Sequence, residues 1–295
     1  MASLKDIKRK IGSVKNTAKT TNAMKLVSSA KLRRTEELAR RSRVYAQKLT
    51  EMLNEIAYRL QQAGGDAMDH HYFTAGHDPK TVDIVFVTAD KGLCGGFNAQ
   101  TIKQVKALID AYKAKDVKIR LRAIGRKGID YFTFNHVELN DKIVGLSSAP
   151  EYAKAAEFIS DVVEAYVNGE TDRVIVVHNG FVNMITQEVR VDQVLPVDPS
   201  KITPSEGAAS ELEVEADQDD ALLEALVKRY VEYSMYYTLI DSLAAEHAAR
   251  MQAMDAATKN AKEMVKSLTI QYNKARQEAI TTELIEIISG MEAMK

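Results

Sequence analysis

The residues best suited to chemistry lie in one short segment, Ala89 to Asn98, which reads Ala-Asp-Lys-Gly-Leu-Cys-Gly-Gly-Phe-Asn. The segment follows an apolar β-branched run and precedes a helix-like stretch. Glycines at such a strand-to-helix turn let backbone N–H groups approach a phosphate. The spacing is not G-x-G-x-x-G, however, and Lys91 precedes the glycines rather than following them as in a P-loop. A nucleotide site therefore stays open beside a simpler interpretation, a tight turn that needs the backbone freedom of glycine.

Other residues that could do chemistry give weaker indications. Cys94 is the only cysteine, so a disulfide framework and a cysteine-based metal cluster are excluded. No acid–base partner can be placed beside it, and a lone cysteine is commonly buried. The segment with His70, His71 and His77 suggests a metal site, although histidines in a loop are usually solvated. We expect His247 to be a packed histidine, and we expect no catalytic residue, cofactor or metal.

Two long segments without proline flank this region. In the C-terminal segment, small or apolar residues recur in alternating steps of four and three, a mean of about 3.5 that is typical of a seam between helices. This row is Leu226, Tyr230, Tyr233, Tyr237, Ile240, Ala244, His247, Met251, Met254, Thr258, Ala261, Val265, Leu268, Tyr272, Ala275 and Ala279. Residues 3–62 carry a matching seven-residue repeat in two rows, one from Leu4 to Leu60 and one from Ile7 to Ile56, each in steps of seven. The residues in these rows are large and apolar at both ends of the segment and small or polar between. We predict an antiparallel coiled coil of an N-terminal helix, residues 1–62, and a C-terminal helix, residues 219–295.

The middle of the chain reads as a separate domain. All five prolines lie between positions 79 and 204. Strand-like runs are expected at 81–88, 117–124, 136–144, 173–178 and 185–197, and helices at 99–112, 128–134 and 150–167. Alternation of this kind predicts a Rossmann-like α/β domain, residues 80–197, on a mainly parallel sheet whose last strand is antiparallel at an edge. The acidic segment 198–218 is predicted to be a linker.

The net charge of −1 hides a strong asymmetry, because residues 1–43 carry thirteen Lys or Arg against three acids. Besides a solvated helix face, such a surface suits nucleic acid, anionic lipid or the acidic loops of another protein. The basic residues surround the helix without interleaved aromatics, which argues against nucleic acid. There is no run of 18 apolar residues and no signal-peptide pattern. Together with the single cysteine, this favours a cytoplasmic protein.

Three segments carry a resemblance to a known family. The first, residues 11–27, reads IGSVKNTAKTTNAMKLV, and the second, residues 90–98, reads DKGLCGGFN. The third lies in the C-terminal segment, with EHAARMQAMDAATKNA at 246–261 and YNKARQEAITTEL at 272–284. The chain resembles the gamma subunit of the bacterial rotary F-type ATP synthase over nearly its whole length.

The resemblance implies a non-catalytic subunit whose paired terminal helices form a central shaft inside a ring of alpha and beta subunits. The α/β domain would rest on the c-subunit ring beside the epsilon subunit, at the cytoplasmic face of the bacterial inner membrane. The shaft would couple proton-driven rotation of the c ring to conformational cycling of the catalytic beta subunits, for ATP synthesis or hydrolysis. The positions carried over as contacts to the alpha/beta ring are Met24, Lys25, Lys91, Cys94, Arg250, Arg276, Gln277, Thr281 and Glu283. The alternatives are a basic coiled-coil module that binds nucleic acid or anionic membrane, and an α/β enzyme that uses the turn at Gly92.

Overall fold

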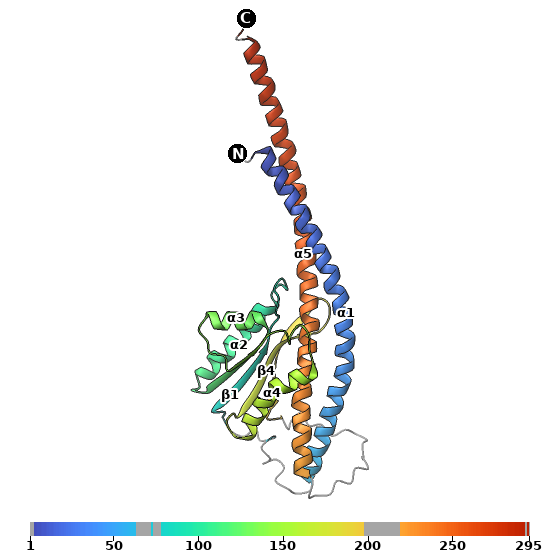
Figure 1. The fold of residues 1–295 in the computed structure, drawn as a ribbon, viewed down its shortest axis with the longest axis vertical. Helices are drawn as coiled ribbons and strands as arrows, with labels where there is room; N and C mark the ends of the chain where they lie inside the picture. The colour runs from blue at the N-terminus through green and yellow to red at the C-terminus, as the bar shows by residue number, and fades with distance from the viewer. Residues whose placement is uncertain (1–2, 63–71, 73–77, 198–218, 293, 295) are drawn as a thin grey trace. The chain divides into compact units, whose positions relative to one another are not determined.

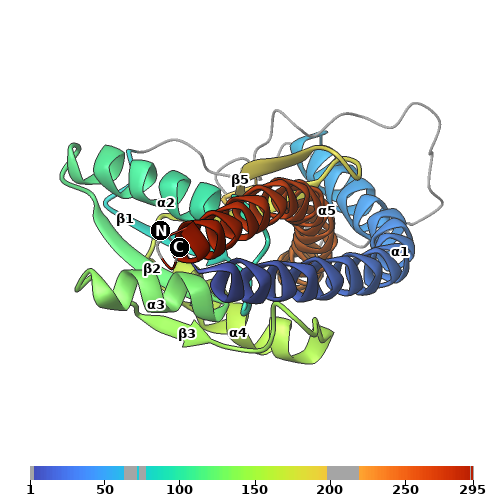
Figure 2. The same ribbon diagram turned by 90° about the horizontal axis from the view of Figure 1, so that it is seen from above.

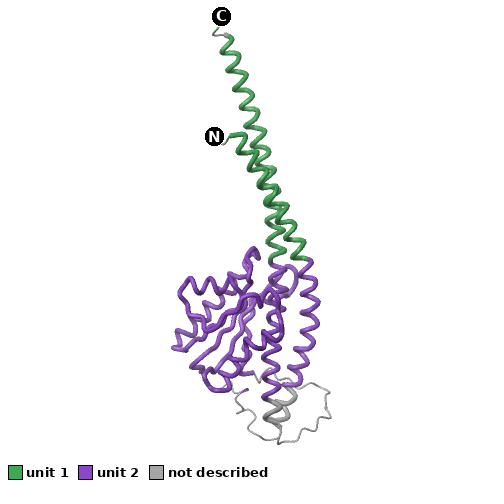
Figure 3. Tube along the Cα trace, in the orientation of Figure 1, with its two compact units in different colours: residues 1–29, 250–295 green, residues 30–249 purple. Residues whose placement is uncertain are grey.

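The computed structural model describes residues 3–62, 72, 78–197, 219–292 and 294. It divides into two compact units (Figure 3). The terminal unit comprises residues 1–29 and 250–295, and the domain unit comprises residues 30–249. The histidines of the suggested metal site, His70, His71 and His77, and the predicted linker 198–218 lie outside the described residues.

Two long helices, α1 (Leu4–Gln62) and α5 (Asp219–Glu292), contain 59 and 74 residues (Figure 1). In the terminal unit, the hydroxyls of Thr21 and Thr258 are 2.7 Å apart. The ammonium of Lys25 lies 2.6 Å from a carboxylate oxygen of Asp255. The residue number on α5 falls as that on α1 rises, so the predicted antiparallel pairing is confirmed.

The heptad pattern places the seam of α1 correctly. Within the described side chains of this helix, the buried residues all belong to the two predicted rows: Ser28, Leu32, Thr35, Ser42, Leu49 and Leu53. The C-terminal row is right up to Ala275 but wrong at Ala279, which is exposed. Helix α1 begins only at Leu4, and every described side chain of α5 from Arg276 to Met291 is exposed.

The domain unit contains a five-stranded sheet in the order β3-β2-β1-β4-β5. The strands are β1 (Thr81–Val87), β2 (Lys118–Ile124), β3 (Asp141–Ile143), β4 (Arg173–Phe181) and β5 (Gln187–Leu195). Strands β1 to β4 pair in parallel, and β5 pairs antiparallel with β4 at the edge. This is the predicted Rossmann-like arrangement. Of the strand expected at 136–144, only the three residues of β3 are observed as a strand.

Helices cover both faces of the sheet because successive strand side chains point to opposite sides. On one face, Ile84 and Phe86 pack with α2 (Phe97–Lys113) and α3 (Arg126–Phe134). On the other face, Val85 and Val87 join a cluster with α4 (Tyr152–Val167) and α5. Helices α2 and α4 accordingly lie on opposite sides of the sheet (Figure 2). The long helix α5 is therefore part of the core of the domain unit.

Truncating a core side chain of α5 tests this arrangement. Leu239 is 0% exposed in the cluster between α5, α4 and the sheet. We expect Leu239→Ala to lower the free energy of unfolding by about 2–5 kcal/mol, because it removes buried methyl groups and leaves a cavity. Urea denaturation measures this change. Leu284→Ala, at an exposed position on the same helix, should change it by less than about 0.5 kcal/mol; equal effects would contradict the packing of α5 on the sheet.

Candidate functional site

The glycine-containing turn after β1 is held together by its own polar groups. The carboxylate of Asp90 accepts N–H bonds from Arg126 at 3.0 Å and from Gly145 at 3.1 Å. The amide oxygen of Asn98 accepts the N–H of Ala89 at 2.9 Å. These bonds tie the turn to the segments that follow β2 and β3. The side chains of Asp90 and Asn98 therefore brace the turn.

The inner side of the turn packs on α5. Ala89, Cys94 and Phe97 form a buried cluster with Ala245 of α5. The side-chain amide of Asn179 donates a hydrogen bond to the carbonyl of Phe97, a member of this cluster, at 2.9 Å. In Rossmann-like sheets, ligands bind beside the carboxyl ends of the strands where the strand order reverses, here between β1 and β4. Helix α5 occupies that place, so the geometry supports the tight-turn interpretation over a nucleotide site.

The two predicted contact residues in this turn differ in exposure. Lys91 is exposed, whereas Cys94 is only 2% exposed. The Cys94 sulfur accepts a hydrogen bond from the side-chain amide of Asn98, at 3.2 Å. Lys91 can thus reach a partner directly, while Cys94 holds the turn in shape.

A buried ionic cluster fastens α5 to the sheet. A carboxylate oxygen of Asp241 lies 2.8 Å from the guanidinium of Arg190 on β5 and 3.3 Å from Nε2 of His178 on β4. Its other oxygen accepts the N–H of Phe181, at 3.3 Å. The sequence showed β5 to be polar on one side, but nothing in it identified a single carboxylate on α5 as the partner. Sequence reasoning missed this cluster.

In the terminal unit, the ammonium of Lys25 forms an ion pair within the chain. It pairs with Asp255, which also pairs with Lys259 at 2.9 Å. The hydrogen bond from Lys25, and then that from Lys259, lowers the pKa of the Asp255 carboxyl to about 2. Met24, beside Lys25, is half-buried. The predicted contact at position 25 therefore lies in a polar layer that joins the two helices.

The remaining predicted contacts lie along α5. Arg250 is buried, as is His247, which was expected to be packed. Arg276, Gln277, Thr281 and Glu283 are all exposed on the part of α5 that extends past α1. Apolar side chains in the same stretch are about half exposed: Ile280, Leu284, Ile285, Ile287, Ile288 and Met291. Roughly 25 Å of helix, at 1.5 Å per residue, thus presents an apolar surface that no described part of the chain covers.

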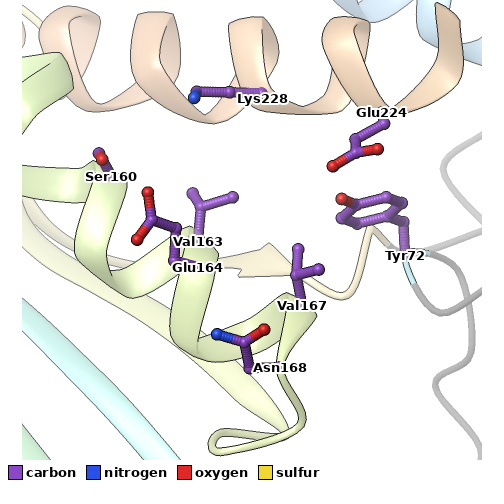
Figure 4. A pocket seen from close by; sticks show the side chains of 8 residues that line it. All are labelled: Tyr72, Ser160, Val163, Glu164, Val167, Asn168, Glu224 and Lys228. Carbon is purple, nitrogen blue, oxygen red and sulfur yellow. The ribbon is translucent and has the colours of Figure 1, made fainter. Parts of the chain in front are cut away.

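A pocket of about 290 Å³ opens between α4 and the first turns of α5 (Figure 4). Val163 and Val167 supply its apolar lining, and Glu164, Glu224 and Lys228 lie around it. Burial, and secondarily the charge of Glu224, raises the pKa of the Tyr72 phenol at one side. Among the described residues, no group of three or more His, Cys, Asp or Glu is arranged to hold a metal ion. Within the same ranges, no helix has both the length and the apolar character needed to cross a bilayer.

Comparison with known proteins gives a consistent result. The family model described as ATP synthase matches residues 3–294. The ATP synthase gamma chain of Sulfurovum sp. (strain NBC37-1) is 71% identical over 295 residues, and that of Helicobacter pylori (strain G27) is 56% identical over 301 residues, each match covering all of both chains. Among solved structures, a chain of the Euglena gracilis mitochondrial ATP synthase (OSCP/F1/c-ring) matches with a TM-score of 0.67. That match has 18% identity and covers 99% of this chain and 94% of the other. A chain of the Tetrahymena thermophila central stalk and c ring matches with a TM-score of 0.61 and 24% identity, over 81% of this chain and 99% of the other. At these identities the structures show a shared fold.

The ion pair of Asp255 predicts a defined pH dependence. Because the pKa of this carboxyl is lowered on folding, its stabilising effect is complete above the ordinary aspartate pKa of about 4 and is lost as the pH falls through about 2. NMR titration of Asp255 should give a midpoint near 2, and Lys25→Gln should move it upward. Glu263→Gln on the same helix is the control and should leave the midpoint in place. A midpoint near 4 in the unmodified chain would contradict the pairing.

Proposed function

The chain belongs to the family of ATP synthase gamma chains, and on that premise we propose that it works as a moving mechanical part with no ATP chemistry of its own. It is the central rotor shaft of the proton-translocating F-type ATP synthase. It couples proton-driven rotation of the c ring to conformational cycling of the catalytic beta subunits, in ATP synthesis or in hydrolysis when reversed. The observation that carries the proposal is the pair of helices α1 and α5, of which α5 extends well beyond the start of its partner.

The composition of the helices suits this work. A helix that transmits torque must be stiff, and neither α1 nor α5 contains a proline that would kink it. Its surface must differ around the axis if three identical catalytic sites are to be held in different states at one moment. Two helices of unequal length with different side chains provide that asymmetry.

We propose that the exposed end of α5 contacts the ring of alpha and beta subunits. Its apolar stripe would otherwise face water, and Arg276, Gln277, Thr281 and Glu283 supply polar contacts beside it. Lys91 contacts the beta subunits from the glycine turn, and the buried Cys94 stabilises the conformation of that turn. Met24, Lys25 and Arg250 act from the paired part of the helices, where Lys25 already bonds to Asp255.

The domain unit is proposed to bind the remaining subunits. We assign its α/β domain to the c ring and the epsilon subunit, which would place the chain as a peripheral subunit at the cytoplasmic face of the bacterial inner membrane. The support is indirect, since a rotor driven by a membrane-embedded ring must be attached to it. The same argument gives the α/β domain a role as the coupling piece between ring and shaft.

The alternative of a basic coiled-coil module for nucleic acid or anionic membrane is not favoured. The likeness to gamma chains spans both helices and the domain between them, whereas a basic binding module would require only the N-terminal helix. The basic residues of α1 are instead suited to sliding past acidic loops without fixed bridges.

The proposal is tested by assembly. Expressed with the alpha and beta subunits of its organism, the chain should purify with both. Alone, it should show neither saturable nucleotide binding nor the steep salt dependence of DNA or anionic-vesicle binding. Saturable ATP binding by the isolated chain would contradict a purely mechanical role.

A double substitution tests the polar contacts at the end of α5. Gln277→Ala together with Thr281→Ala should lower ATP turnover of the assembled complex about two- to fivefold, as expected when surface contacts worth roughly 0.5–1 kcal/mol are lost. The side chains are exposed, so the unfolding of the isolated chain should be unchanged. Lys103→Ala with Lys106→Ala, exposed on α2, is the control, with turnover measured in the complex of this chain with alpha and beta alone, where the partners assigned to the α/β domain are absent. Unchanged turnover in the test variant would remove Gln277 and Thr281 from the contacts.

A further inference from the structure

A single buried carboxylate on α5 contacts two neighbouring strands of the sheet. The side chain of Asp241 is 5% exposed, and one of its oxygens lies 2.8 Å from the guanidinium of Arg190 and 3.3 Å from Nε2 of His178. The other oxygen accepts the N–H of Phe181, at the end of β4, at 3.3 Å. Both oxygens of one side chain are thus used to hold α5 on the sheet. We call Asp241, Arg190 and His178 the Asp241 cluster.

The sheet leaves room for this contact at Gly180. In the antiparallel pair of β4 and β5, Arg190 lies opposite His178, and Gly180 is the next residue of β4 on the same face. A Cβ on Gly180 would lie 2.5 Å from both Cζ and Nε of Arg190. The guanidinium therefore crosses β4 at a position that has no side chain. The glycine lets Arg190 reach Asp241 on the helix.

The apolar contact of α5 does not by itself hold the helix at one angle. Val227, Val231, Met235 and Leu239 are buried in the cluster that α5 shares with α4 and the sheet. Hydrophobic burial is non-directional and depends mainly on the area removed from water. Charge-assisted hydrogen bonds, in contrast, weaken steeply when donor and acceptor move out of line. A small rotation of α5 about its axis is therefore resisted most sharply by the Asp241 cluster.

Helix α5 is continuous across the boundary between the two units. Its residues up to Ala249 belong to the domain unit, and those from Arg250 onward belong to the terminal unit. Rotation imposed on the α/β domain passes into α5 through the contacts of this helix with the sheet and with α4. A directional contact on that path transmits the rotation with little twist between the domain and the helix.

We propose that the Asp241 cluster is the torque-bearing joint between the α/β domain and the shaft, in which Arg190 and His178 hold α5 against rotation relative to the sheet. The inference rests on the proposed function and names the positioning residues through which the torque passes. Asp241 and His178 are buried, so weakening the cluster changes the joint without altering the exposed surface at the end of α5. The joint should then twist more easily while the catalytic ring works as before.

A bead attached to the domain unit tests the joint in the complex of this chain with alpha and beta, held by the ring. Lys106→Cys, exposed on α2, gives the attachment point, since the chain's own Cys94 is 2% exposed. Without ATP, the angular fluctuations of the bead measure the torsional stiffness between the ring and the domain. Asp241→Asn keeps the shape of the side chain but removes its charge, and should increase the variance of these fluctuations about twofold or more. ATP turnover of the complex without a bead should be unchanged.

Two further variants separate the joint from general stability. Gly180→Ala places a methyl group against Arg190 and should also increase the variance. Combined with Asp241→Asn it should add little, because both variants break the same ion pair. Phe132→Leu, buried on α3 at the opposite face of the sheet, lowers the stability of the domain but should leave the variance unchanged. Should Asp241→Asn not assemble, Gly180→Ala, which leaves α5 unaltered, decides by the same measurement.

The outcomes distinguish the joint from the rotor function. Unchanged fluctuations in the variants of Asp241 and Gly180, or an equal increase in Phe132→Leu, would overturn the joint and leave the rotor function standing. Additive effects of Asp241→Asn and Gly180→Ala would overturn it as well, because the two residues would then act separately. A bead on the unmodified complex that does not rotate when ATP is added would overturn the rotor function itself.

Discussion

Burial of one side of α5 against the sheet is the interaction on which the domain unit depends. Val227, Val231, Met235 and Leu239 recur every four residues and are almost completely buried. Side chains on the neighbouring side of the same helix, such as Ile240 and Ala244, lie on the seam predicted to face α1. Helix α5 thus packs against the sheet on one side and faces α1 on the other. The Asp241 cluster adds directional bonds to this apolar contact and fixes where along β4 and β5 the helix lies.

The helical seams were predictable because a seven-residue repeat is a local property of the sequence. The mainly parallel sheet with an antiparallel last strand could be inferred for a similar reason, since strand and helix signals alternate along the sequence and βαβ connections are strongly constrained. What could not be predicted were contacts between residues far apart in the chain. Asp241 looks like any other acid on a helix until β4 and β5 are placed beside it. Ala279 continues the repeat, but its exposure depends on where another helix begins.

The candidate site shows how the same local sequence can serve different purposes. Glycines after the first strand of a Rossmann-like sheet often admit a phosphate, and from sequence alone that possibility had to stay open. Here Ala245 fills the space and Cys94 is buried against it. A helix of the same chain lies where other Rossmann-like folds bind a small-molecule ligand, which agrees with the general rule that fold does not determine function.

The uncovered end of α5 also bears on the life of the chain before it joins its partners. An isolated helix of this length is only marginally stable in water, and its isoleucines and leucines favour self-association. A newly made copy is therefore prone to aggregation and to proteolysis at that end. A surplus of free subunit would be lost to quality control, so the surface that we assign to the alpha and beta subunits would also limit how much of the free subunit accumulates.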